Sequence, residues 1–183
     1  DCVRAFSYLK QHAEEWGCDS TQISVGGDSA GGNLALATAM SIDGVHKVIP
    51  IYPVTKLFTE TTPSWEKYAK GYGNDAELLE AFNEAYAQKE THNPLVSVGL
   101  ASDAALTKLP PVLILSAGHD ILFDQTAELA VRLKKTESSP SVSRLSDSHT
   151  PLHHSSRAAD SILRSRENHR PLPERELIRF TIC

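Results

Sequence analysis

One stretch of the sequence restricts the fold more than any other, because an apolar strand pattern changes into a helix pattern around a single serine, Ser29. Ile23 and Val25 are typical of a short buried strand, whereas Leu34–Met40 is rich in helix formers and too long for a strand. Glycines lie on both sides of the serine. A strand that passes so directly into a helix forces strained dihedral angles on the turn residue and requires small neighbours. The stretch therefore predicts a tight strand–turn–helix unit that exposes the Ser29 hydroxyl at the end of a sheet.

The pattern Gly27-x-Ser29-x-Gly31 also indicates a chemistry. Such a turn directs the free N–H of Ala30 and the positive end of the following helix toward whatever Ser29 attacks. A glycine-rich structural turn is the alternative, but the strand before the serine and the helix after it are the context that the motif requires. Ala30 and the following helix argue against a trypsin-like protease, and the missing Gly-Lys-Ser/Thr excludes a phosphate-binding loop. The sequence predicts a serine nucleophile on an α/β scaffold.

The run Gly-Asp-Ser-Ala-Gly-Gly-Asn-Leu-Ala at Gly27–Ala35 resembles the hormone-sensitive-lipase-like branch of the α/β-hydrolases, which includes acetyl esterases and short-chain carboxylesterases. The resemblance extends from Asp1 to Lys135 and implies an α/β-hydrolase fold with a partial, mostly parallel sheet, flanking helices and a cap insertion. It implies hydrolysis of short-chain acyl or aryl esters through an acyl-enzyme. The strand–turn–helix unit around Ser29 then corresponds to a nucleophile elbow. The residues that the resemblance implies for this elbow and for the binding of the oxyanion are Gly27, Asp28, Ala30, Gly31 and Gly32.

Composition and charge bound the classes of partner. With 183 residues, 40% of them hydrophobic, the chain can bury a core as one domain. A net charge of −5 leaves no basic surface for nucleic acid, and no apolar run reaches the roughly 18 residues of a membrane span. Cys2, Cys18 and Cys183 have no metal-ligand spacing and are expected to be idle thiols in a reducing compartment. The idle thiols favour a cytoplasmic protein, and the resemblance implies a small-molecule ester as its substrate, with no metal or cofactor needed.

The organisation of the chain is predicted in three parts. Residues 1–136 are expected to form a hydrolase core fragment, with a cap insertion at about residues 55–108, and residues 137–183 an atypical tail that is shifted in reading frame or poorly ordered. The insertion is rich in aromatic residues, which suggest the lining of an apolar substrate pocket; among them are Trp65, Tyr68, Tyr72, Phe82 and Tyr86. An ordinary surface excursion is the alternative. A complete hydrolase of this class needs about 250 residues or more, so the chain is interpreted as the C-terminal part of one.

Strands are further predicted at residues 22–26, 47–54 and 109–120, and helices at residues 2–16, 76–88 and 122–134. Pro50 removes one ladder donor, so a bulge or strand end is expected there. The last of these strands ends in Asp120, where the resemblance places the acid that orients a catalytic histidine. Asp124 is the second candidate, although it is expected in the first turn of the next helix, and His119 is expected to be a neighbour rather than the base.

The base itself is the least defined group. His149 lies about thirty residues after Asp120, where the resemblance expects the base, and we assign that role to it ahead of His153 and His154. Its surroundings lack the small apolar frame that the resemblance implies, and a histidine in a serine- and arginine-rich tail is usually exposed and idle. Residues 141–146 are a possible weak strand, and Arg164–Cys183 does not resemble a packed element.

A His-Gly-Gly-Gly loop, which the resemblance implies as a source of further oxyanion donors, is missing from the sequence. Activity of this chain is therefore expected to be impaired. Two alternatives remain: a non-catalytic binder of a small molecule on the same fold, and an inactive fragment with an exposed sheet edge.

Overall fold

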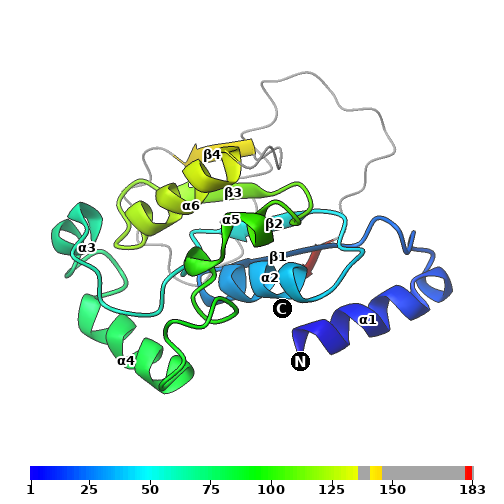
Figure 1. Ribbon diagram of the computed structural model, residues 1–183, viewed down its shortest axis with the longest axis horizontal. Coiled ribbons are helices and arrows are strands. Elements are labelled where there is room, and N and C mark those ends of the chain that lie inside the picture. The colour runs from blue at the N-terminus through cyan, green and yellow to red at the C-terminus, as the bar shows by residue number, and fades with distance from the viewer. Residues whose placement is uncertain (136–140, 146–179, 183) are drawn as a thin grey trace.

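A parallel sheet forms the centre of the computed structural model, which describes residues 1–135 and the backbone of residues 141–145 and 180–182. Its strands follow the order β4-β3-β2-β1-β5 (Figure 1). They are β1 (Ser24–Asp28), β2 (Val48–Ile51), β3 (Leu113–Ala117), β4 (Ser141–Leu145) and β5 (Phe180–Ile182). The expected α/β fold is confirmed, and the strand that ends at Ser29 lies inside the sheet, between β2 and β5.

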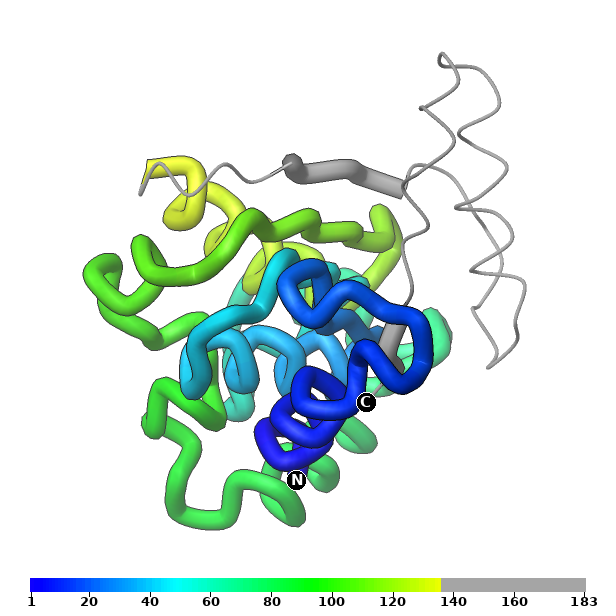
Figure 2. The backbone as a smooth tube through the Cα atoms, turned by 90° about the vertical axis from the view of Figure 1, so that its right-hand side faces the viewer, coloured from blue at the N-terminus to red at the C-terminus, as the bar shows by residue number. Residues whose placement is uncertain are grey.

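One helix precedes the first strand, and the others lie in the connections between the strands. They are α1 (Cys2–His12), α2 (Ala30–Ser41), α3 (Pro63–Lys67), α4 (Ala76–Ala87), α5 (Asp103–Leu106) and α6 (Phe123–Lys135), with short 3-10 turns η1 (Glu14–Trp16) and η2 (Val98–Leu100). Helix α1 contacts α2 on the outside of the molecule (Figure 2). Gly17 follows η1 with φ 65°, a left-handed conformation that suits glycine and ends the helical segment. No helix in the described part of the chain is both long enough and apolar enough to cross a membrane.

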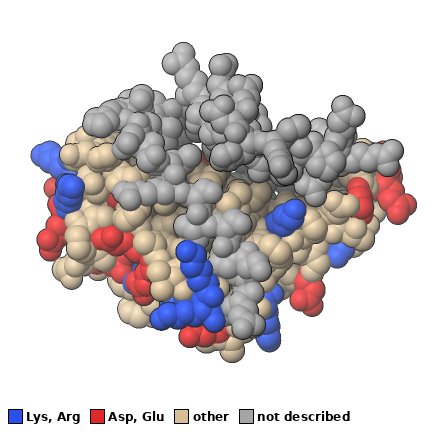
Figure 3. Space-filling model, turned by 90° about the horizontal axis from the view of Figure 1, so that it is seen from above, with Lys and Arg blue, Asp and Glu red and all other residues tan. Residues whose placement is uncertain are grey.

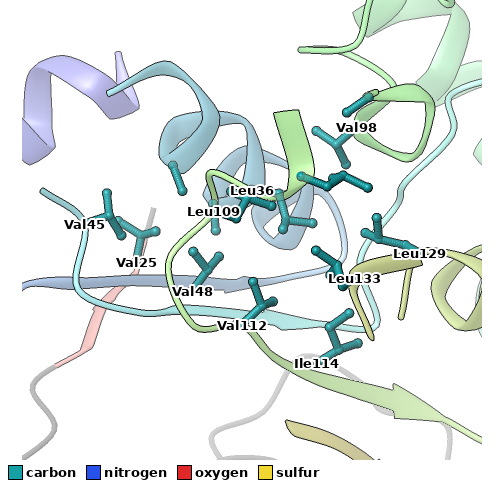
Figure 4. Packing of buried hydrophobic residues seen from close by; sticks show 14 of the residues in the cluster. Val25, Leu36, Val45, Val48, Val98, Leu109, Val112, Ile114, Leu129 and Leu133 are labelled. Carbon is teal, nitrogen blue, oxygen red and sulfur yellow. The ribbon is translucent and has the colours of Figure 1, made fainter. Parts of the chain in front are cut away.

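The main hydrophobic core lies between the strands and the helices α2 and α6 (Figure 4). Val48 and Ile114 from the sheet side, Leu36 from α2, and Leu129 and Leu133 from α6 are almost completely buried. Burial of each such side chain contributes about 1.5–3 kcal/mol. Because α2 and α6 pack into one core, the segments that precede each helix, at the ends of β1 and β3, are held at the same edge of the sheet.

Pro50 interrupts the hydrogen-bond ladder between β2 and β3. The prediction of a bulge or strand end there is wrong, because β2 continues to Ile51 and pairs with β1 residue by residue. Val48 N donates to Pro111 O at 3.0 Å, and Tyr52 N donates to Leu115 O at 2.6 Å. Proline has no N–H to make the bond that belongs between these two. Strand β2 therefore pairs continuously only with β1, and the chain leaves it through Tyr52, which has φ 35°.

The excursion between β2 and β3 packs through a second hydrophobic cluster near the ends of these strands. Its members are Val54, Leu57, Trp65, Tyr68, Leu79, Ala87, Ile121 and Leu122. Trp65 and Tyr68 are buried, but Tyr72, Phe82 and Tyr86 are exposed by 49%, 57% and 55%. Tyr72, Phe82 and Tyr86 therefore lie outside this cluster, and the expectation that the aromatic residues line an apolar substrate pocket stays a prediction. On α4, helical spacing turns Leu79 and Ala87 to the cluster and leaves Phe82 and Tyr86 outside it.

Two short strands lie in the tail. Strand β4 pairs with β3 within the stretch where a weak strand is possible from the sequence. Strand β5 is not predicted by the sequence, and it covers Ser24–Gly26 of β1 on the side opposite β2. On the face shown in Figure 3, acidic and basic side chains of the described residues are interspersed rather than gathered in one patch.

Candidate active site

Ser29 occupies a strained turn between β1 and α2. Its φ of 53° and ψ of −116° are sparsely populated for a residue with a side chain, and such a conformation typically costs about 1–3 kcal/mol. Two sets of hydrogen bonds hold it there. Ser29 N donates to Ile51 O at 2.9 Å, and Ser29 O accepts from Gly32 N, Asn33 N and Val54 N at 3.1–3.2 Å. The tight strand–turn–helix unit that the sequence predicts is present, with Ser29 partly exposed at the end of the strand.

The glycines of the turn are there for steric reasons. A Cβ atom on Gly27 would lie 2.6 Å from the backbone carbon of Gly31, and one on Gly32 would lie 2.8 Å from Cβ of Pro53. These distances are shorter than van der Waals contact, and the nearest atoms belong to the backbone or to a rigid ring. The strand, the helix and the segment after β2 can approach this closely only where glycine is present.

Ala30 is the first residue of α2 and lies on the surface. The first N–H groups of a helix have no partner inside the helix, and the helix dipole makes that end partly positive. A negative charge that develops beside Ser29 is therefore favoured by this end of α2. The oxyanion role of Ala30 and of the glycines remains a prediction.

Asp120 follows β3 and is largely buried. Its Oδ1 accepts from Leu122 N at 2.9 Å. Burial raises the pKa of the Asp120 carboxyl, and the hydrogen bond from Leu122 opposes this shift. A carboxylate in such a site gains from a cationic or hydrogen-bond-donating partner, which is what a histidine offers.

The phenol of Tyr52 is affected by the charges of both Asp28, next to Ser29, and Asp120. Burial is the first cause that raises its pKa, and the charges of Asp28 and Asp120 raise it further. Asp28 ends β1 immediately before Ser29, so one half-buried phenol lies within electrostatic range of both the elbow strand and the acid loop. Sequence reasoning missed Tyr52, although its place directly after a buried strand beside the elbow strand was a usable signal.

The second acidic candidate, Asp124, has another role. It lies in the first turn of α6, as expected, and its Oδ2 accepts from Ser64 N at 2.7 Å. It thereby holds α3 to α6. His119 is exposed, and its ring lies edge-on to Tyr68 with 5.7 Å between ring centroids. That His119 is a neighbour of the acid rather than the base stays a prediction.

The three tail histidines considered as the base, His149, His153 and His154, lie outside the described residues. Within the described ranges, no group of three or more His, Cys, Asp or Glu is arranged to hold a metal ion. Two hollows of about 430 Å³ each lie elsewhere, one between the end of α2 and α5, the other between α1, α2 and Tyr86. Neither is lined by Ser29 or Asp120, because both lie against α2 away from the ends of the strands.

Comparison with known proteins agrees with this geometry. Residues 1–149 match the family described as alpha/beta hydrolase fold. The chain is 34% identical over 143 residues to an arylesterase of Saccharolobus solfataricus, and 32% identical over 170 residues to lipase 2 of Moraxella sp. (strain TA144). A hyperthermophilic esterase from the archaeon Pyrobaculum calidifontis matches with a TM-score of 0.77 at 28% identity, over 90% of this chain and 58% of that structure.

The two sequence matches cover 74% of this chain but only 46% of the arylesterase and 38% of the lipase. The chain thus spans less than half the length of these relatives. The resemblance that the run around Ser29 indicates is confirmed by the family match and by the esterase names of the relatives. The chain belongs to the alpha/beta hydrolase fold family.

Proposed function

We propose that the protein to which this sequence belongs hydrolyses carboxylic esters, with Ser29 as the nucleophile. The observation that carries the proposal is the strained conformation of Ser29 at the junction of β1 and α2, with φ 53° and ψ −116°. A structural turn has no need of a serine in this conformation, and a glycine there would be free of strain. Strain that is retained at a partly exposed hydroxyl beside a helix N-terminus is typical of a nucleophile elbow.

The proposed reaction proceeds through an acyl-enzyme. Ser29 Oγ attacks the carbonyl carbon of the ester while a histidine accepts the hydroxyl proton. The Asp120 carboxylate accepts a hydrogen bond from Nδ1–H of that histidine and stabilises the imidazolium, and Ala30 N–H donates to the oxyanion. The alcohol leaves with the proton from the histidine. A water molecule, deprotonated by the same histidine, then releases the acid from Ser29.

His149 is the proposed base. Parallel strands β3 and β4 are neighbours, and the chain leaves β4 at Leu145, four positions before His149. Strand ends at one edge of a parallel sheet lie close to one another, so a residue soon after β4 is within chain reach of the loop after β3 that carries Asp120. His153 and His154 are further along the chain and serve as comparison positions.

The proposed substrates are esters with a short acyl group or an aryl alcohol group. Support comes from the resemblance around Ser29 and from the name of the arylesterase relative. This sequence contains no His-Gly-Gly-Gly run to supply further oxyanion donors, so a protein of this sequence alone is proposed to turn over slowly. Removal of one such donor typically lowers a rate by about 10²–10³-fold.

Hydrolysis of p-nitrophenyl acetate tests the proposal. We expect a burst of p-nitrophenol in proportion to the protein, lost in Ser29→Ala and retained in Ser41→Ala. Ser41 is a matched control because it lies in α2, is exposed and donates its hydroxyl to Ala37 O at 2.7 Å. We also expect His149→Ala to lose the burst and His153→Ala to keep it.

The alternatives give different results. A folded protein without a burst would contradict ester hydrolysis; saturable binding of a small molecule by that protein would favour the non-catalytic binder, and no binding the inactive fragment. A burst that survives in His149→Ala but not in Ser29→Ala would support Ser29 as the nucleophile and contradict His149 as the base.

A further inference from the structure

Both backbone groups of Val54 bind the elbow segment. Val54 N donates to Ser29 O at 3.2 Å, and Val54 O accepts from Asn33 Nδ2 at 2.9 Å. Val54 lies in the segment that follows β2, three residues after the end of that strand. The carbonyl of Ser29 is thus held by a residue that is itself held by the side chain of Asn33.

The amide of Asn33 binds a second segment as well. Asn33 is 3% exposed, and its Nδ2 also donates to Val96 O at 2.8 Å. Both partners are carbonyl oxygens, which only accept, so the amide nitrogen has to face them. Among the described residues, Asn33 Oδ1 has no hydrogen-bond partner. A buried acceptor without a partner is unfavourable, so any stabilisation by this amide comes from the two hydrogen bonds of its nitrogen.

Because Ser29 is strained, its conformation depends on the hydrogen bonds that its carbonyl accepts. Of the three N–H groups that donate to Ser29 O, those of Gly32 and Asn33 belong to the first turn of α2. They are satisfied by any ordinary helix start. The bond from Val54 N is the one that ties the Ser29 carbonyl to another segment, and it fixes the peptide plane that follows the nucleophile. A strained residue persists only where its surroundings determine its conformation.

We infer that Asn33 is a positioning residue for Ser29: through Val54, its amide holds the peptide after the nucleophile in the orientation that presents the hydroxyl and the Ala30 N–H to an ester. The inference rests on the proposed function of Ser29. Asn33 does not touch the substrate in this account. A displacement of about 1 Å at a reacting group lowers a rate by up to about 10²-fold, so a loosened peptide plane affects acylation more than substrate binding.

Gln125 provides a matched control. It is 1% exposed, and its Oε1 accepts from Thr55 N at 2.6 Å and from Lys56 N at 2.9 Å. It is therefore a second buried amide that holds the same segment after β2, immediately beside Val54. Its side-chain oxygen binds Thr55 and Lys56 rather than Ser29 or Val54. A variant of Gln125 disturbs the segment to a similar degree without releasing the Ser29 carbonyl.

The experiment compares Asn33→Leu with Gln125→Met, and uses Asn33→Ala, which leaves room for water, if Asn33→Leu does not fold. The first measurement is the rate of the acylation burst with p-nitrophenyl acetate. We expect Asn33→Leu to lower the acylation rate by about 10-fold or more with KM within about two-fold of the wild type. Gln125→Met is expected to keep the acylation rate and KM within about three-fold of the wild type. It should lower the melting temperature about as much as Asn33→Leu does.

The second measurement is independent of activity. Amide hydrogen exchange is followed at Val54, with Thr55 as the internal reference. We expect faster exchange of Val54 N–H in Asn33→Leu and of Thr55 N–H in Gln125→Met. Unchanged exchange at Val54 in the Asn33 variants, or equal losses of acylation rate in both variants, would overturn the inference. If the wild type gives no burst but Val54 N–H exchanges faster in Asn33→Leu, the proposed function is overturned. The structural part of the inference, that Asn33 fixes the Ser29 peptide through Val54, is then still supported.

Discussion

Ser64 and Asp124 exchange hydrogen bonds between the first turns of two helices. Ser64 N donates to Asp124 Oδ2 at 2.7 Å, and Asp124 N donates to Ser64 Oγ at 3.1 Å. The same hydroxyl donates to Ile121 O at 3.0 Å. These bonds join α3, in the excursion after β2, to the start of α6. The carboxylate of Asp124 is therefore engaged in structure, whereas that of Asp120 accepts from the Leu122 N–H.

The same substitution at the two aspartates is expected to have different effects. Asp120→Asn should lower the acylation rate by about 10³–10⁴-fold, because an amide does not stabilise the imidazolium or fix its tautomer. Asp124→Asn keeps an acceptor for Ser64 N and should keep the rate within about three-fold. It loses a charge at the start of α6, which lowers the free energy of unfolding by about 0.3–1 kcal/mol. Burst kinetics and urea unfolding of both variants check this, and the reverse pattern would make Asp124 the acid.

Buried charge predicts how stability depends on pH. Because burial raises the pKa of Asp120, the folded protein binds its proton more tightly than the unfolded chain does. The free energy of unfolding should therefore fall as pH rises from the ordinary value, 3.8, through the raised pKa of Asp120. Asp120→Asn removes this penalty, so it should be more stable than the wild type at pH 7 and lose that advantage below pH 3.8. A variant that is less stable than the wild type at pH 7 would contradict this.

The glycine substitutions test the close approach at the elbow. Gly27→Ala places a Cβ atom 2.6 Å from backbone that has no room to move. It should lower the free energy of unfolding by about 3 kcal/mol or more, at the upper end of overpacking effects. Gly73→Ala is the control: no atom lies within 4 Å of its Cβ position, and only its φ of 106° opposes the change. Thermal unfolding of both variants measures the difference, and equal losses would mean that the turn is loosely packed.

Tyr52 reports on the charges around the site. Its phenol should titrate above the ordinary pKa of 10.0, because burial and the charges of Asp28 and Asp120 oppose ionisation. The difference in absorbance at alkaline pH between wild type and Tyr52→Phe isolates this group. Asp28→Asn should lower the pKa of Tyr52, and Asp43→Asn, an exposed aspartate that is not among the causes of the shift, should leave it unchanged. A Tyr52 pKa that is unchanged in Asp28→Asn would contradict an electrostatic interaction between the phenol and the Asp28 carboxylate.

The parts of the site that follow from local sterics could be read from the sequence. The turn at Ser29 was predictable because the chain itself, through Gly27 and Gly31, makes the strand and helix cross too closely for side chains. The missing ladder donor at Pro50 was predictable because it is a property of one residue, but the bulge or strand end expected there is absent, since β2 continues to Ile51. The place of Asp120 after an apolar strand was likewise a local pattern.

The remainder depends on contacts between distant segments. The hold of Asn33 on Val54 and Val96 joins residues 21 and 63 positions apart, and no local pattern contains it. The exposure of Phe82 and Tyr86 depends on which side of α4 meets the core. Strand β5 pairs with β1 across more than 150 residues of sequence. Phe180, Thr181 and Ile182 all favour a strand, but no local pattern places them beside β1.

Covalent labelling of Ser29 tests the central claim most directly. The folded protein is treated with diethyl p-nitrophenyl phosphate, which transfers a phosphoryl group to an activated serine, and the intact mass and the modified peptide are then measured. The account predicts one diethylphosphoryl adduct per chain on Ser29, absent in Ser29→Ala and present in Ser41→Ala. An unmodified folded protein, or an adduct on another residue in place of Ser29, would contradict it.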